Sequence, residues 1–456
     1  MRVVLDRDGG ALNGKAHSPR DGRKRGVTPR TAGAGGERHV TRHASTASRS
    51  PRDPVMTTFY AIAGLLVVAS HAHGAIDIAY NVLPLYSYQI GMFLFASGWF
   101  YHERNELHPL RWAWKRVRHL LLPLFAINAA YGVIGNLVAP LVGFEFVPQL
   151  GMDALVRQPL LGGDMFVLDN PLWFVFPFFC ATAIDFALHT ALDALTGTRA
   201  HGRGDALGSA SVGGSGASAA IDVGLAIAYT VAFVTVQPMP GFVDAPVTSL
   251  HALAVRTLFM MPLVAYGRVL SHHCPRVSHA TTRTSVLMVI ASLLAAVVTV
   301  TLMGDPVFLA AHASFPAGPV APLVTSMCGT MMWLGVSQLV GERVGRMRSV
   351  ELLSRSTLGL MANQIAGFEV LNLAFLGLDR LGIVHGFDMR KFVTDIWYEY
   401  RPMMPFTVHG AQIGDAFSFV YVVFGTALVL LAGRGIALAW ERIRRAARDG
   451  KARRDA

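Results

Sequence analysis

The chain has 456 residues, of which 52% are hydrophobic and only 15% are charged, and its mean hydropathy is +0.42. Soluble globular domains carry about a quarter charged residues, so this composition excludes an ordinary water-soluble protein. The net charge of +11 does not indicate nucleic-acid binding, because twelve Lys or Arg against five Asp or Glu fall within residues 1–56. Three scattered cysteines, Cys180, Cys274 and Cys328, are too few for a disulfide framework or a zinc site.

The first 56 residues are rich in Gly, Ser, Thr and Arg and contain neither an apolar face nor a signal-peptide core. We expect residues 1–56 to form a disordered basic tail on the cytoplasmic side. They can equally be sequence translated upstream of the true start, since Met56 directly precedes the first apolar stretch. The functional alternative is an arm that binds anionic lipid or nucleic acid.

Apolar stretches long enough to cross a bilayer follow. They predict an all-α, polytopic membrane helix bundle of about ten transmembrane helices over residues 57–435. Basic residues alternate loop by loop, with 22 on one side and five on the other. Because cytoplasmic loops carry the excess of Lys and Arg, we expect both termini to be cytoplasmic, with 436–456 as a basic tail. The predicted helices cover roughly 57–75, 83–102, 119–141, 170–192, 221–237, 250–270, 284–303, 321–341, 356–378 and 413–434.

The first predicted helix carries two ionisable side chains, His71 and His73, in the outer half of the membrane. An imidazole in lipid needs a partner, so it is a candidate functional group, although a packed and hydrogen-bonded histidine is the alternative. Side chains two residues apart on a helix point about 200° away from each other. We therefore expect only one of the two histidines to face a site.

The second predicted helix ends in MFLFASGWF, where Ser97 and Gly98 suit close helix packing. The run RWAWKRVRH follows and places Lys115, Arg116 and Arg118 at the expected cytoplasmic end of the third helix. Membrane topology alone explains such a basic run. Arginine also suits bidentate recognition of phosphate, and the interleaved aromatic residues suit a ligand that carries a nucleotide.

Two longer segments are expected on the outer face, where a polar acceptor would dock. Residues 142–169 precede the sequence NPLWF, and residues 379–412 contain MRKFVTDIWYEYRP. The aromatic residues Trp397, Tyr398 and Tyr400 can anchor the chain at the interface or contact a substrate, and the sequence leaves both open. No GxxxxGK[ST], GxSxG, HExxH or GxGxxG motif supports ATP coupling or serine chemistry.

The order of these motifs resembles the acyltransferase 3 family, whose members are membrane proteins that O-acylate sugars and polysaccharides. The resemblance rests on LLVVASH, MFLFASGW, KRVRHLLLPLF and NPLWFVFPFF, together with LLSRSTLGLMANQIAGF at 352–368, which looks like the family's late helix. It spans about 57–435 and is strongest at 59–125. Two positions depart from the family pattern. Tyr60 stands where an arginine often precedes the histidine by eleven residues, and Asn363-Gln364 stands where the late helix commonly carries a histidine.

The resemblance implies a role for eight residues. His71 is expected to be the catalytic general base, with Asn363 or Gln364 as a donor to the developing oxyanion. The resemblance further assigns the acyl-CoA site to Lys115, Arg116 and Arg118, and the acceptor site to Ser97 and Trp173.

The implied function is an integral membrane O-acyltransferase, multi-pass in a bacterial inner membrane. It would move an acyl group, with acetyl expected, from acyl-CoA to a hydroxyl of a carbohydrate or cell-envelope polysaccharide. The expected partners are this acceptor, acyl-CoA and the lipid bilayer, with no nucleic acid, no bound metal and no tightly bound cofactor. One alternative is a catalytically inactive relative.

Another alternative is a transporter or exporter of a polar or lipid-linked metabolite. Helices interrupted by Gly and Pro favour it. The two halves of the chain show no internal repeat, and intramembrane carboxylates for ion coupling are few, with Asp185 and Glu369 as the main ones.

Overall fold

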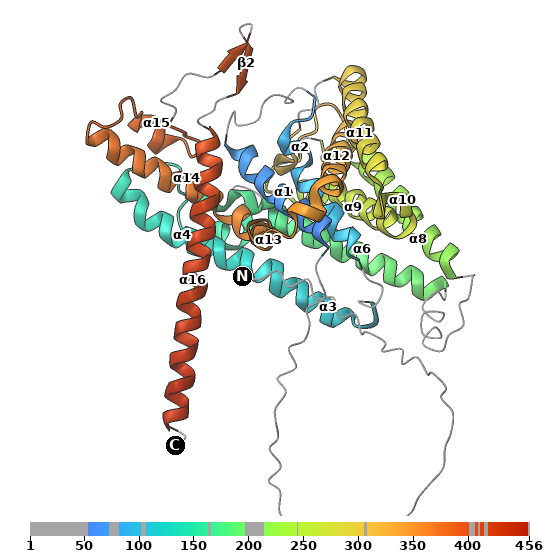
Figure 1. Cartoon of the computed structure of the whole chain (residues 1–456), viewed down its shortest axis with the longest axis horizontal. Coiled ribbons are helices and arrows are strands. Elements are labelled where there is room, and N and C mark those ends of the chain that lie inside the picture. The colour runs from blue at the N-terminus through green and yellow to red at the C-terminus, as the bar shows by residue number, and fades with distance from the viewer. Residues whose placement is uncertain are drawn as a thin grey trace, which may run out of the picture. The chain divides into compact units, whose positions relative to one another are not determined.

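The fold was analysed in a computed structural model (Figure 1). It describes residues 53–72, 82–101, 106–162, 166–196, 214–243, 245–304, 308–400, 406–408, 411–414 and 418–454. Most of the predicted N-terminal tail, His73 and most of the stretch between the predicted helices 170–192 and 221–237 lie outside these residues.

Nine helices in the described part of the chain are long and apolar enough to cross a membrane, which confirms an all-α polytopic bundle. The remaining predicted span, the second in chain order at 83–102, forms α2 (Leu85–Trp99). Its 15 residues fall short of the roughly 20 that a spanning helix needs. The nine are α1 (Pro54–His71), the continuous α3 (Pro109–Arg116), η3 (Val117–Leu121) and α4 (Leu122–Val142), η5 (Val167–Phe174) with α6 (Val175–Thr196), α8 (Gly214–Val236), α9 (Leu250–His273), α11 (Thr282–Met303), α12 (Val320–Val344), α14 (Thr357–Arg380) and α16 (Ser418–Arg454).

Shorter elements connect these helices. They are η4 (Asp153–Arg157), α5 (Gln158–Leu161), α10 (Pro275–Ser278), η7 (Ala310–His312), α13 (Arg348–Arg355), α15 (Met389–Thr394) and an antiparallel hairpin of β1 (Phe406–Val408) and β2 (Ala411–Gly414).

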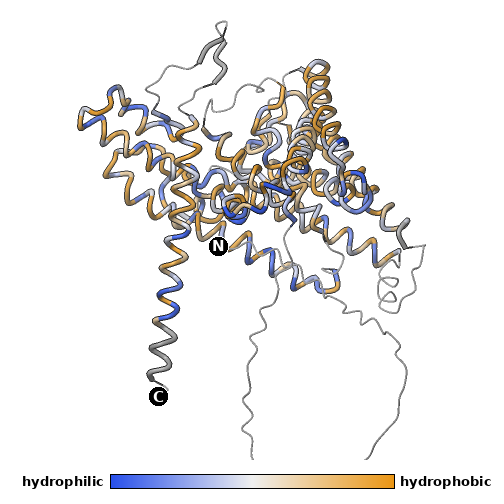
Figure 2. Tube along the Cα trace, in the orientation of Figure 1, coloured by the Kyte–Doolittle hydropathy of each residue, from blue (hydrophilic) through white to orange (hydrophobic). Residues whose placement is uncertain are grey.

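Hydrophobic residues run along most of the length of the long helices, as Figure 2 shows. On α11, large apolar side chains such as Leu287, Leu294 and Val298 are exposed rather than buried. Lipid tails are as apolar as leucine, so a helix that faces the bilayer does not need to bury such side chains in protein. The exposed side chains therefore agree with a membrane bundle.

Helix α1 lies at the centre of the contacts and packs against α2, α12, α13 and α14. It begins at Pro54, and the side chain of Asp53 caps it by accepting hydrogen bonds from the backbone N–H groups of Val55 and Met56. Its last residue is His71. The central position of α1 is what brings this histidine next to segments from later in the chain.

Two glycines bring α2 and α9 into backbone contact. A Cβ atom on Gly98 would lie 1.8 Å from the carbonyl oxygen of Val264, and one on Gly267 would lie 2.0 Å from that of Phe95. No side chain fits at either position. The packing role expected for the small residues of FASGW is therefore present at Gly98.

The helix from α3 to α4 contains one π-helical turn, η3, immediately before Pro123. Proline has no N–H to continue the α-helical hydrogen bonds. Single π-helical turns within α-helices are rare and frequently lie at functional sites. The turn contains Arg118 and directly follows Arg116. It thus sets the direction in which the basic side chains leave the helix.

The last helix begins at Ser418, five residues later than expected, and continues without a break to Arg454. It therefore runs through most of the predicted C-terminal tail. Inside the bundle it approaches α14 closely, because Gly367 lies against the backbone of Gly425. This contact places the outer part of α14 beside α16.

Candidate functional site

The imidazole of His71 is oriented by its own helix. Its Nδ1 lies 2.8 Å from the carbonyl oxygen of Val67 and 3.2 Å from the hydroxyl of Ser70. A carbonyl can only accept, so Nδ1 carries the proton in this hydrogen bond, and the neutral ring holds its lone pair on Nε2. This is the tautomer that a general base needs.

The ring of His71 stacks on the indole of Trp397, with centroids 5.6 Å apart and planes 20° apart. Trp397 is itself held by a turn, because its backbone N–H donates to the Asp395 carboxylate at 2.9 Å. The segment 379–412 was expected to contribute either interfacial anchors or substrate contacts. The structure places Trp397 against the candidate base, which favours a role at the site.

We expect the two amides of α14 to lie near the depth of His71. Gly64 of α1 lies against Thr357 of α14, where an added Cβ would stand 3.0 Å from the Thr357 methyl group. In the expected topology both helices run outward, so we expect His71 and Gln364, each seven residues or about 10 Å further along, to lie at similar depth. Gln364 is fully buried, and its Oε1 has no hydrogen-bond partner among the described residues. Asn363 accepts a 2.6 Å hydrogen bond from Tyr131 of α4.

Asp169 is a candidate site residue that the sequence analysis did not single out. It belongs to η5, is fully buried, and neither of its carboxylate oxygens has a hydrogen-bond partner in the described part of the chain. It lies close enough to Tyr131 for an electrostatic interaction. A buried carboxylate without a partner is costly, and such groups in native proteins commonly have a functional explanation. The signal was present, because Asp169 directly precedes the NPLWF motif.

The basic residues at the other end of the bundle differ in burial. Arg116 is half-buried, lies over the ring of Trp112 at 5.5 Å from its centroid, and donates a long hydrogen bond of 3.4 Å to Ser97. Lys115 and Arg118 are exposed. The structure thus joins one predicted CoA-binding residue, Arg116, to one predicted acceptor-binding residue, Ser97.

Arg116 also interacts electrostatically with Tyr60. Tyr60 occupies the position eleven residues before His71 at which the sequence departs from the resembled pattern. The guanidinium of Arg116 therefore brings a positive charge to this region of α1 from another helix. Trp173, the other predicted acceptor contact, is 8% exposed and packs edge-on against Phe174 in the main hydrophobic core.

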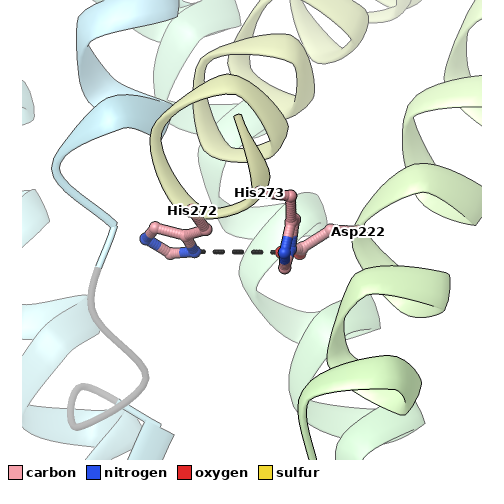
Figure 3. A group of neighbouring side chains, drawn as sticks. All are labelled: Asp222, His272 and His273. Carbon is pink, nitrogen blue, oxygen red and sulfur yellow. Dashed lines mark hydrogen bonds and ion pairs between the residues drawn. The ribbon is translucent and has the colours of Figure 1, made fainter. Parts of the chain in front are cut away.

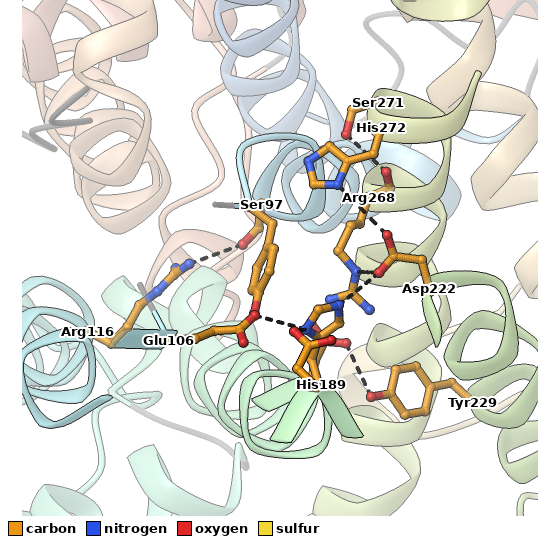
Figure 4. A network of polar contacts seen from close by, with 12 residues as sticks. Ser97, Glu106, Arg116, His189, Asp222, Tyr229, Arg268, Ser271 and His272 are labelled. Atoms are coloured by element: carbon orange, nitrogen blue, oxygen red, sulfur yellow. Dashed lines mark hydrogen bonds and ion pairs between the residues drawn. The ribbon is translucent and has the colours of Figure 1, made fainter. Parts of the chain in front are cut away.

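A buried polar network joins α6, α8 and α9 (Figure 4). Arg268 forms ion pairs of 2.6 Å with both Asp185 and Asp222. His189 bridges Asp222, at 3.0 Å from Nε2, and Glu106, at 2.9 Å from Nδ1. Removing one partner from such a network leaves a buried charge uncompensated, which is strongly destabilising. Directly bonded members are up to 83 residues apart in sequence. Of these residues the sequence analysis had singled out only Asp185, as an intramembrane carboxylate considered for ion coupling.

Glu106 is the member of this network that lies between the spanning helices, and it is 3% exposed. Burial alone would raise the pKa of its carboxyl group, but hydrogen bonds from His189 and Tyr101 outweigh burial and hold that pKa below its usual value. Glu106 therefore stays ionised at neutral pH. Its carboxylate is already engaged by His189 and by the phenol of Tyr101.

Comparison with known proteins adds one finding. Residues 61–360, more than half of the chain, match the family model for the acyltransferase 3 domain, described as an acyltransferase domain. The matched region contains His71, Ser97, Arg116, Arg118 and Trp173, whereas Asn363 and Gln364 lie just beyond its end. No curated protein and no solved structure matches the chain.

Proposed function

Because the chain belongs to the acyltransferase 3 family and is a multi-pass membrane acyltransferase, we propose that it acetylates a hydroxyl group of a carbohydrate or cell-envelope polysaccharide, with acetyl-CoA as the donor. The observation that carries this proposal is the orientation of His71. Its Nδ1 is held by Val67, its ring is stacked on Trp397, and its basic nitrogen is Nε2. Family membership makes an enzyme the better interpretation than a transporter.

In the proposed reaction, Nε2 of His71 removes the proton of the acceptor hydroxyl as its oxygen attacks the thioester carbonyl. The new C–O ester bond forms, the C–S bond breaks, and the CoA thiolate leaves and is protonated. A positioned base of this kind contributes about 10²–10⁴-fold to the rate. A thioester is already activated, so the step needs no protein nucleophile.

The amide of Asn363 or Gln364 would donate to the carbonyl oxygen as negative charge develops on it. Asp169 would accept a hydrogen bond from a hydroxyl of the acceptor, which would supply a partner that its buried oxygens do not find among the described residues. Trp397 offers an aromatic face to the same acceptor, whose access is from the outer side in the topology expected from the basic-residue asymmetry.

The donor would bind from the opposite side. Arg116, with the exposed Lys115 and Arg118 beside it, would hold the phosphates of CoA. Tyr60, near Arg116, and His71 are eleven positions apart on α1, which corresponds to about 16 Å. The long pantetheine arm would have to cover this distance between the phosphates and the base. The donor would approach from the cytoplasmic side and the acceptor from the outer side. This separation explains why the reaction takes place inside a membrane protein.

The experiment is transfer of radiolabel from acetyl-CoA to a polysaccharide fraction in membrane vesicles that contain the full chain. His71→Ala should reduce transfer by about 10²-fold or more, the worth of a general base, at unchanged protein level and acetyl-CoA affinity. The matched control is His385→Ala, an exposed histidine in the segment 379–412. Equal transfer by the two variants would show that His71 is not the base. Absence of transfer by the unchanged chain to any carbohydrate would refute the proposed acceptor class.

A further inference from the structure

Two imidazoles and a carboxylate converge where α9 ends beside α8 (Figure 3). His273 Nε2 lies 2.7 Å from Asp222 Oδ2, and His272 Nδ1 lies 3.8 Å from the same oxygen. One potential ligand atom from each of the three residues lies within 4.8 Å of the other two. The three side chains therefore offer two nitrogen ligands and one oxygen ligand to a common point.

The distances suit a shared ion. In a tetrahedral zinc site with bonds of about 2.0–2.1 Å, neighbouring ligand atoms stand about 3.3–3.4 Å apart. The His272 separation, 3.8 Å, is somewhat longer than that value. The His273 separation, 2.7 Å, is that of a direct hydrogen bond to Asp222, so His273 has to move back by several tenths of an ångström to share an ion. A separation of 3.8 Å is too long for a hydrogen bond. A direct bond to Asp222 thus does not explain why the ring of His272 faces the carboxylate, whereas a shared ion does.

The surroundings hold the carboxylate in place. Asp222 is 1% exposed, and its other oxygen, Oδ1, is engaged by His189 at 3.0 Å and by Arg268 at 2.6 Å. Metal-binding residues are commonly fixed by such outer partners, whose loss costs about 10–100-fold in affinity. Oδ2 is left to face the two histidines.

Two of the three candidate ligands are accessible to an ion from outside the protein. The side chains of His272 and His273 are 29% and 23% exposed, unlike the buried Asp222. They are the last two residues of α9, at the end that the basic-residue asymmetry places toward the cytoplasm. A second group, Glu106, His189 and Asp193, has comparable ligand atoms, but all three residues are buried, whereas two of the three residues of the first group are accessible.

We propose that Asp222, His272 and His273 bind one Zn²⁺ ion that ties the end of α9 to α8, with a fourth position open to water. Two imidazoles with a carboxylate are a ligand set that zinc accepts, whereas Mg²⁺ and Ca²⁺ prefer oxygen ligands throughout. The sequence does not reveal this site, because its ligands stand 51 residues apart on two helices.

The test is zinc binding by the purified full chain in detergent, after removal of metal with a chelator. We measure bound zinc by mass spectrometry and affinity by competition with a chelating dye. The unchanged chain should bind one ion. His272→Ala and His273→Ala each remove a direct ligand, so each should weaken zinc affinity by at least as much as the loss of an outer partner does, about 10–100-fold. His279→Ala, an exposed histidine shortly after α9, is the matched control and should bind like the unchanged chain.

Thermal unfolding of the same samples shows whether each variant is folded. Asp222→Asn also alters the buried network, so the half-exposed His272 provides the decisive variant. Zinc should raise the thermal unfolding midpoint of the unchanged chain and of His279→Ala, but not that of His272→Ala. Millimolar Mg²⁺ should not displace the zinc. Equal zinc binding by the double variant His272→Ala/His273→Ala, or none by the unchanged chain, would overturn the proposal.

Discussion

The phenol of Tyr131 donates a hydrogen bond of 2.6 Å to Oδ1 of Asn363, across 232 residues of sequence. The amide nitrogen of Asn363 donates to the carbonyl oxygen of Gly359 at 2.7 Å, which leaves one amide proton for a ligand. Tyr131 therefore fixes which end of the amide faces the site. An oxyanion donor at Asn363 depends on this orientation.

Replacing Asn363 should separate chemistry from folding. Asn363→Ala should lower kcat by about 10²–10³-fold if its amide stabilises the oxyanion, with little change in the KM for acetyl-CoA. Tyr131→Phe removes only the orienting bond, worth about 1 kcal/mol, and should lower kcat about fivefold. A kcat for Asn363→Ala within twofold of the unchanged enzyme would assign the role elsewhere, with Gln364 the next residue to test.

Asp169→Asn should raise stability and lower activity together. The change removes a buried carboxylate that has no hydrogen-bond partner in the part of the chain that the structure describes, so we expect a higher thermal unfolding midpoint in detergent. The same change weakens the proposed hydrogen bond to the acceptor hydroxyl and should raise the KM for the acceptor. A variant that is more stable and has unchanged acceptor kinetics would make Asp169 irrelevant to binding.

Arg116 should determine donor affinity. Arg116→Ala loses a charge-assisted contact to phosphate, worth about 1.5–3 kcal/mol, and should raise the apparent Kd of acetyl-CoA about 10–100-fold at constant protein level. Lys115→Ala should have a smaller effect because Lys115 is exposed. Competition with unlabelled CoA measures both. Equal, small effects of the two variants would indicate that the basic run serves topology alone.

The contact between α2 and α9 should not tolerate a methyl group. Gly267→Ala places Cβ 2.0 Å from the carbonyl oxygen of Phe95, so the helices must separate. We expect a loss of about 1–3 kcal/mol or more, as in other overpacked cores, seen as a lower unfolding midpoint. Gly224→Ala is the matched control, since a Cβ there meets nothing within 4 Å. Equal midpoints for the two variants would contradict the close approach.

The start of α1 predicts how far the N-terminus can be shortened. A chain that begins at Asp53 keeps the cap of α1, whereas one that begins at Met56 loses Asp53 and the contact of Pro54 with Gly345. Loss of a capping side chain costs about 0.5–2 kcal/mol. We therefore expect the Met56 chain to insert but to unfold at a lower temperature than the Asp53 chain. If the Asp53 chain also loses activity at normal stability, residues 1–52 carry a function.

The membrane class, the position of nearly every long helix and the candidacy of His71 and Arg116 followed from the sequence. Hydropathy, helix length and the bias of basic residues are local properties of the chain, so they can be read without knowing which helices touch. The resemblance to the acyltransferase 3 family, now confirmed by the family match, also rests on short local motifs. The roles assigned to individual residues stay predictions.

Only the tertiary structure decided which polar side chains meet. Tyr131 reaches Asn363, Arg268 pairs with Asp185, and Asp222 faces His272 and His273 because of the rotation and depth of each helix against its neighbours. Close contacts at Gly98 and Gly267 with backbone atoms, and at Gly64 with the side chain of Thr357, set that rotation and depth, and they depend on where two distant segments pack. A hydrophobic pattern shows that a helix is buried in a membrane, but a difference of one residue in register changes every polar partner it finds.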